Sequence, residues 1–125
     1  MIKLTFCLRR LPKLTLVEFQ DYWFDKHAPL VAKHRDALRI RRYVQMHTTD
    51  TAMNAAMRAI RGGPEGYDGV AELWWDSIDD IMTNDSAEAR AAGLELLEDE
   101  RRFIDLENSP LWFGNERTIF SAPNS

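Results

Sequence analysis

His27 is the residue of this 125-residue chain best suited to move a proton. Histidine titrates near neutral pH, so its imidazole can accept a proton from a bound molecule or donate one. The imidazole belongs to a series of residues that recur at spacings of three or four and lie within an arc of about 80° on a helix: Leu16, Phe19, Trp23, His27, Leu30 and His34. His27 should therefore point into the protein, where it serves either proton transfer or a structural hydrogen bond to a backbone carbonyl. His34 is expected to be structural.

Asp105 is the carboxylate that we expect to assist His27. Arg101 and Asp105 are separated by one turn of a segment with helical periodicity, which allows an ion pair able to orient a neighbouring imidazole. A salt bridge on the surface of a helix explains the same pair without any catalytic role. Asp105 and His27 are the predicted catalytic residues.

Tryptophans supply candidate walls for a pocket that binds a flat ligand. In the strand pattern Gly69 to Trp75, Trp74 shares a face with Val70 and Glu72, whereas Trp75 lies on the opposite face. Such rings can contact a ligand or simply fill a core. The predicted substrate-binding residues are Trp23, Tyr67, Trp74 and Trp112.

Several other kinds of site and partner are disfavoured by the sequence. The three histidines form no HxH or HExxH pattern, so no metal site is predicted. Gly62, Gly63 and Gly66 lie in a loop pattern rather than in the strand-to-helix context of a phosphate site. A net charge of −4 disfavours nucleic acid as a partner. With one cysteine, Cys7, no readable signal peptide and no long apolar run, we expect a cytoplasmic protein with no membrane association.

Four strands and two principal helices must position these residues. Strands are predicted at 2–8, 39–49, 69–75 and 112–120. One helix begins after the capping-box pair Thr15 and Glu18 and should be disturbed at Ala28 by Pro29. Ser77 is expected to cap a short helix that ends at Met82, and a longer helix should extend from Ser86 to Asn108. The stretch 51–67, with two helical turns at 52–60, is expected to be a mobile lid or an arm at a dimer edge.

The order strand, helix, strand, strand, helix, strand predicts an α+β protein with the ferredoxin-like βαββαβ fold. Its four-stranded antiparallel sheet would carry both helices on one face. The other face, expected to display Thr5, Cys7 and Tyr43, would need a cover, and a second copy of the sheet is the simplest one. We therefore expect a single domain over 1–120, a frayed tail over 121–125, and a homodimer.

Four segments of the chain resemble the EthD domain family: Ile2 to Phe6, the run Phe19 to Trp23 that leads to His27-Ala28-Pro29-Leu30-Val31, Tyr67 to Glu72, and Phe103 to Asp105. The resemblance covers nearly the whole chain, and its most specific part is Tyr-Trp followed by His-x-Pro. It implies a dimeric α+β barrel, built from two ferredoxin-like subunits, with a pocket between the sheet and the helices of each. The family takes its name from a pathway that degrades an ether fuel additive, in which its member accompanies an oxidising system.

Two classes of function follow from the resemblance and the residues. The first is a cofactor-free enzyme, or an accessory component of an oxidoreductase pathway, in which His27 moves a proton on a small hydrophobic aromatic or carbonyl compound. Oxidation is the favoured reaction, and polyketide cyclisation, isomerisation and decarboxylation are alternatives. The second is a non-catalytic module that carries or protects a hydrophobic intermediate for a partner oxidoreductase. No cofactor is predicted, although relatives of similar fold leave haem open, with His27 as its axial ligand.

Overall fold

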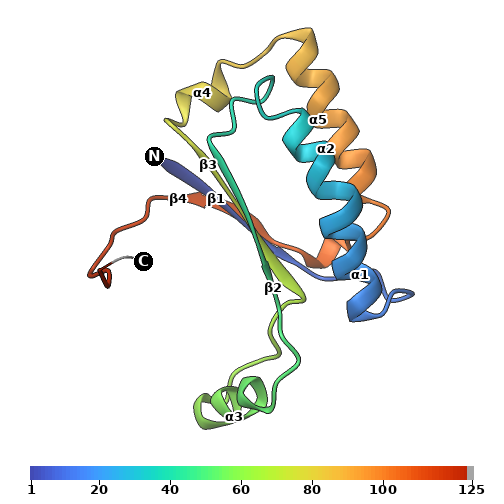
Figure 1. The fold of residues 1–125 in the computed structure, drawn as a ribbon, viewed down its shortest axis with the longest axis vertical. Helices are drawn as coiled ribbons and strands as arrows, with labels where there is room; N and C mark the ends of the chain where they lie inside the picture. The colour runs from blue at the N-terminus through green and yellow to red at the C-terminus, as the bar shows by residue number, and fades with distance from the viewer. Residues whose placement is uncertain (124–125) are drawn as a thin grey trace.

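Four antiparallel strands form one sheet in the order β2-β3-β1-β4, which is the strand order of a ferredoxin-like fold (Figure 1). The strands are β1 (Ile2–Leu8), β2 (Arg42–His47), β3 (Gly69–Trp75) and β4 (Leu111–Gly114). This computed structural model describes residues 1–123, so the end of the predicted frayed tail, positions 124 and 125, lies outside the described residues. Among those described, no helix has the length and apolar character needed to cross a membrane.

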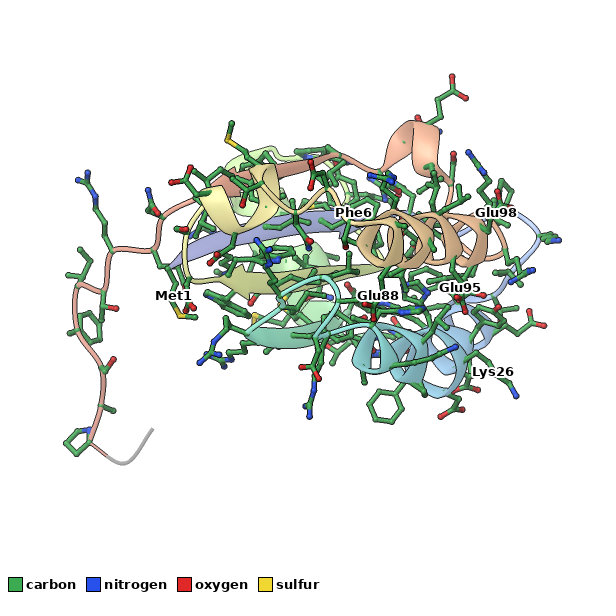
Figure 2. The ribbon with its side chains drawn as sticks, turned by 90° about the horizontal axis from the view of Figure 1, so that it is seen from above. Met1, Phe6, Lys26, Glu88, Glu95 and Glu98 are labelled. Atoms are coloured by element: carbon green, nitrogen blue, oxygen red, sulfur yellow. The ribbon has the colours of Figure 1, made fainter. Side chains whose placement is uncertain are left out.

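The main helices lie on one side of this sheet, as predicted (Figures 1 and 2). The first helical rod comprises α1 (Leu16–Tyr22), a π-helical turn η1 (Trp23–His27) and α2 (Ala28–Lys33). The second is α5 (Ala87–Glu100), which lies beside the first. The predicted α+β class and the two-layer arrangement are confirmed.

The first helical rod begins where the sequence predicts and passes Pro29 without a break. The Thr15 side chain accepts from the Glu18 N–H, and the Glu18 carboxylate accepts from the Thr15 N–H, which completes the capping box. Proline has no N–H to donate to the preceding turn. The chain adapts by widening one turn, so that the Ala28 N–H donates to the Trp23 carbonyl in a π-helical bond. The predicted irregularity beside His27 is thus a π turn.

The second helix is shorter than predicted. Ser86 caps it through a bond from the Ala89 N–H, as expected, but the helix ends at Glu100 instead of Asn108. Beyond it the chain pairs with the segment after β1: the Leu11 N–H donates to the Phe103 carbonyl, and the Asp105 N–H donates to the Arg9 carbonyl. Because residues 103 and 105 use their backbone groups in these bonds, the helix does not continue through them. The prediction that Asp105 lies on this helix is therefore wrong.

Several smaller boundaries also differ from the predictions. Strand β2 covers Arg42–His47, which is shorter at both ends than the predicted 39–49. Strand β4 ends at Gly114 rather than at Phe120. The short helix α4 (Asp79–Met82) has no side-chain cap, so Ser77 does not play the predicted role. The helix within 51–67 is α3 (Ala52–Arg61), which buries no residue and projects from the end of the sheet that carries the β2–β3 connection (Figure 1).

The two faces of the sheet differ in their side chains. The register pairs Thr5 with Glu72 and Cys7 with Val70 on the face without helices, as predicted for Thr5 and Cys7. The helix-covered face carries a core that includes Phe6, Leu8, Phe19, Trp23 and Phe103. Tyr43 packs against this core, so its predicted place on the open face is wrong: it pairs with Leu73, whose side chain also faces the helices.

Candidate functional site

An apolar pocket lies between the sheet and the two helical rods. Its volume is about 230 Å³. Strands β1 and β3 supply Leu4, Phe6, Ala71, Leu73 and Trp75, and the helices supply Trp23, His27, Val31, Leu96 and Glu100. Among the described residues that line it, the titratable groups are His27, Glu100 and Tyr43, and there is no lysine or arginine. The pocket therefore combines apolar walls with a few groups able to exchange protons.

His27 is held in this pocket by Asp99. The imidazole Nδ1 lies 2.7 Å from the Asp99 Oδ2, and both side chains are 7% exposed. The phenyl ring of Phe103 lies 5.0 Å from the imidazole, centre to centre, and limits its rotation. Because the π turn ends at His27 and α5 ends one residue after Asp99, the π turn inside the first rod and the end of α5 fix this pair.

Asp99 has enough donors to remain ionised although it is buried. The Tyr22 hydroxyl donates to its Oδ1 at 2.6 Å, and the Arg102 guanidinium donates to the same oxygen at 3.0 Å. Burial alone would raise the pKa of Asp99, but the hydrogen bonds from Tyr22, His27 and Arg102 outweigh it and lower the pKa. An ionised Asp99 can only accept a hydrogen bond, so the proton of the neutral imidazole must be on Nδ1, which donates it to Asp99.

His27 is therefore a neutral base near pH 7. Burial lowers its pKa below the usual 6.5, and the neighbouring Asp99 carboxylate offsets only part of that effect. With the proton on Nδ1, the lone pair of the neutral ring is on Nε2. No described residue makes a hydrogen bond to Nε2, so this nitrogen is available to a ligand in the pocket.

Glu100 places a second carboxyl group on the wall of the same pocket. Its side chain makes no hydrogen bond or ion pair with any described residue. Burial raises its pKa to about 7, and the neighbouring Asp99 carboxylate adds to the shift, whereas Arg101 opposes it. A substantial fraction of Glu100 is consequently a neutral carboxylic acid at neutral pH.

Trp23 forms a wall of the pocket and depends on a glycine. Its indole stacks on His47 with ring centres 4.6 Å apart and is 1% exposed. A Cβ at Gly69 would lie 2.4 Å from the Trp23 ring, which is too close for any real contact. Gly69 therefore provides the space that the Trp23 ring occupies.

Three of the predicted ligand-contacting residues lie elsewhere. Trp74 and Trp112 point from the open face of the sheet, where Trp74 is flanked by Lys3 and Arg42. Tyr67 packs under Arg9 beside an open hollow of about 990 Å³ next to α3. Trp23 is the member of the predicted set that lines the pocket.

The predicted partner of His27 also lies elsewhere. The Asp105 carboxylate accepts from the Asn108 side chain at 2.7 Å, and Arg101 pairs with Glu98 instead of Asp105. His34 bonds Glu95, a contact that joins α2 to α5. The carboxylate at His27 is Asp99, six residues before the predicted one.

Sequence reasoning missed both Asp99 and Glu100, although a signal for them exists. Residues 98–100 form an acidic run, Glu-Asp-Glu, which resembles a solvated helix face. The small or apolar residues of α5 that turn toward the interior, Ala89, Ala92 and Leu96, continue at spacings of three and four to Asp99, Glu100 and Phe103. Following that arc through the acidic run would have identified the inward carboxylates. Among the residues that the structure describes, no group of three His, Cys, Asp or Glu side chains is placed to hold a metal ion.

The fold and this site define a ferredoxin-like α+β domain with an apolar pocket between sheet and helices. The EthD domain model matches residues 11–107, so the chain belongs to the EthD domain family. None of the curated protein sequences compared with the chain matches it.

Solved structures support the fold. An EthD family protein from Bacillus halodurans C-125 is 19% identical, with a TM-score of 0.60, and the match covers 94% of this chain and 100% of that one. An EthD-like protein from Ralstonia eutropha JMP134 is 16% identical, with a TM-score of 0.58 and coverage of 96% and 95%. A dimeric protein of ferredoxin-like fold and unknown function from Bacteroides fragilis NCTC 9343 is 11% identical, with a TM-score of 0.57 and coverage of 92% and 95%.

Proposed function

We propose that this protein binds a small hydrophobic aromatic or carbonyl compound in the pocket and that His27 moves a proton on it without a cofactor. The observation that carries the proposal is the bond of 2.7 Å between His27 Nδ1 and a buried, ionised Asp99. This bond orients a neutral imidazole whose Nε2 can act as a general base. Removal of a proton is a step that oxidation, cyclisation and isomerisation share. The single cysteine favours a reducing, cytoplasmic location.

The size of the pocket supports a compact ligand. Pockets for drug-sized molecules usually have volumes of about 300–1,000 Å³, and this one has about 230 Å³. A bicyclic aromatic ketone is a suitable probe, whereas a haem is far larger than the cavity. His27 also uses Nδ1 for Asp99, and its Nε2 faces a space too small for a porphyrin. The residues present therefore do not fit haem.

The proposal can be tested with 2-tetralone, a neutral bicyclic ketone whose α-protons exchange with D2O through an enol. We expect the protein to bind it, with shifts in the NMR signals of Val31 and Leu73, and to accelerate the exchange above the rate in buffer. His27→Gln should keep the binding and slow the protein-dependent exchange by about 10²–10⁴-fold. His34→Gln is the matched control, because His34 lies on the same rod but contacts Glu95 outside the pocket.

A ligand carrier is the second candidate, and the apolar lining of the pocket favours it equally. A carrier would bind 2-tetralone without accelerating the exchange, and His27→Gln would then change the thermal midpoint rather than any rate. Mass spectrometry of small molecules that copurify with the wild-type protein would identify the cargo. For both candidate functions, the enzyme and the carrier, we propose that the protein works together with a partner oxidoreductase.

We also propose that the protein is a homodimer. The open face of the sheet and the adjoining β4 expose large apolar side chains, among them Met46 and Trp112, each 53% exposed. A monomer rarely leaves such a patch in water. The similar protein from Bacteroides fragilis is described as dimeric. Packing of two open faces against each other would cover the patch in both copies.

A further inference from the structure

We propose that Glu100 is the second proton-transfer group of the pocket and that the ligand is a neutral, enolisable ketone or a related hydroxy-carbonyl compound. This inference rests on the proposed function of His27. In it, Glu100 donates a proton to the carbonyl oxygen while His27 Nε2 removes a proton from the adjacent carbon.

The position of Glu100 is the first support. It is the last residue of α5 and follows Asp99, so the two carboxylates point to different surroundings. Asp99 is surrounded by three donors, whereas the Glu100 side chain has no hydrogen-bond partner among the described residues and lines the apolar pocket. The Glu100 side chain is partly buried, and no fully buried side-chain oxygen or nitrogen of the described residues lacks a hydrogen-bond partner, so the Glu100 carboxyl oxygens are accessible to a ligand in the pocket.

The groups around Glu100 favour its neutral form. Its own helix end contributes Asp99, which raises its pKa, and Arg101, which lowers it less. From β2, the Tyr43 ring lines the same pocket; burial is the main reason that the pKa of this phenol is raised, and Glu100 makes a smaller contribution in the same direction. The π turn contributes neutral His27, while β1 and β3 contribute apolar side chains. No cation among the described lining residues stabilises an ionised Glu100.

Together the two groups form a complete acid–base pair. The neutral His27 takes a proton from the α-carbon, the C–H electrons form the enol double bond, and the carbonyl oxygen receives the proton of Glu100. The product is a neutral enol beside an imidazolium and a carboxylate. Return of a proton from His27 to the α-carbon, with return of the hydroxyl proton to Glu100, restores the ketone and both residues and accounts for deuterium exchange. In a β,γ-unsaturated ketone, return of the proton to the γ-carbon of the dienol instead completes an isomerisation. No oxidant or reductant is consumed.

The charges of the pocket also define the class of ligand. Without a lysine or arginine on the described lining, a ligand carboxylate would be desolvated without a counterion and would repel any ionised Glu100. A neutral ligand with one acceptor for Glu100 and one acidic proton for His27 meets both groups. The pocket should therefore select against organic acids of the same size.

The test uses the full chain, 2-tetralone as the neutral probe and 2-naphthoate as the anionic one. We expect 2-naphthoate to bind at least tenfold more weakly than 2-tetralone at pH 8. Glu100→Gln should retain 2-tetralone binding but slow the protein-dependent deuterium exchange tenfold or more, because general acid catalysis contributes about 10²–10⁴-fold. Glu88→Gln, on the exposed side of the same helix, is the control and should exchange at the wild-type rate (Figure 2).

A titration of the wild-type protein adds a readout that does not depend on activity, and the variants serve only to assign its signal. With glutamate labelled by ¹³C at its carboxyl carbon, one signal should titrate near pH 7, and it should disappear in Glu100→Gln but not in Glu88→Gln. In pH profiles, exchange should be fastest between the lowered pKa of His27 and about 7.

The outcomes separate this inference from the proposed function. Wild-type exchange in Glu100→Gln, together with lost exchange in His27→Gln, would overturn the role of Glu100 and leave that of His27. Wild-type exchange in both variants, or a buffer rate in the wild type, would contradict both. Equal binding of the two probes would contradict the preference for neutral ligands. If no glutamate titrated above pH 6, Glu100 could not be the proton donor.

Discussion

The bond between Asp99 and His27 decides which nitrogen of the imidazole meets a ligand. A carboxylate that holds Nδ1–H keeps Nε2 as the acceptor, and loss of that carboxylate frees the ring to rotate and to change tautomer. Tyr22 and Arg102 contribute indirectly, because their bonds to Oδ1 keep Asp99 ionised. These two side chains are positioning residues for His27.

Asp99→Asn should lower the rate of protein-dependent exchange on 2-tetralone by about one to two orders of magnitude. An amide either loses the Nδ1–H bond or holds the wrong tautomer. The variant should also lose about 1–3 kcal/mol of unfolding free energy, because buried donors lose a charged partner. Exchange kinetics and urea unfolding measure the two effects. Asp105→Asn should change the exchange rate little, and an equal loss in both variants would contradict the assignment of Asp99.

Glu100→Gln should stabilise the protein at pH 8 by about 1–3 kcal/mol and have little effect near pH 4.5. The pKa of Glu100 is raised from 4.5 to about 7 in the folded state. The folded state therefore binds more protons than the unfolded chain in this range, and the wild type loses stability as pH rises from 4.5 to 7. Glutamine is neutral and removes this loss. Urea unfolding at both pH values tests it, and parallel pH dependence of the two proteins would count against the assignment.

At the scale of elements, the helices position the pair and one strand provides room for it. The π turn places Trp23 and His27 at its two ends, and the end of α5 brings Asp99 against His27 and Glu100 to the wall of the pocket. Strand β3 begins with Gly69, against which the Trp23 ring packs. The geometry of the site is thus shared among three elements that are distant in sequence.

Gly69→Ala should destabilise the protein by about 1–3 kcal/mol, because the new methyl group overlaps the Trp23 ring and the packed core can make room only by moving that ring. A shift of Trp23 should also alter its fluorescence and weaken 2-tetralone binding. Gly63→Ala is the control, since a Cβ there meets nothing within 4 Å. Thermal unfolding compares the two variants, and equal midpoints would show that Trp23 moves aside at no cost.

At the scale of the whole molecule, the uncovered face of the sheet leads us to expect a homodimer. Sedimentation equilibrium at micromolar concentration should give about twice the 14.5 kDa chain mass. A charge in the apolar patch, as in Trp112→Glu, should shift the equilibrium toward monomer, because it would be buried without a partner. Glu88→Gln, on the opposite layer, should leave the dimer intact. A wild-type monomer at all concentrations would exclude the dimeric barrel.

Alternation and capping residues in the sequence were sufficient to predict β1, β3 and the starts of α1 and α5. These are local features: side chains alternate along a strand, and Thr15 and Ser86 bond backbone within three residues. The ferredoxin-like fold and the place of His27 in the interior followed from the same patterns, whereas the family followed from the resemblance of four segments of the chain. The inward position of Trp23 could also be predicted, because Trp23 shares a helical face with His27.

The tertiary structure alone decided which carboxylates belong to the site. Whether α5 ends at Glu100 or continues past Asp105 depends on backbone bonds to residues 9–11, which are about ninety positions away in sequence. That ending selects Asp99 over Asp105 as the partner of His27, and it aims Glu100 at the pocket. The sides of Tyr43 and Trp74 likewise depend on strand register, because a shift by one residue exchanges the two faces of a sheet. The sequence by itself determined the fold and the inward position of His27, and long-range pairing determined which carboxylates lie beside it.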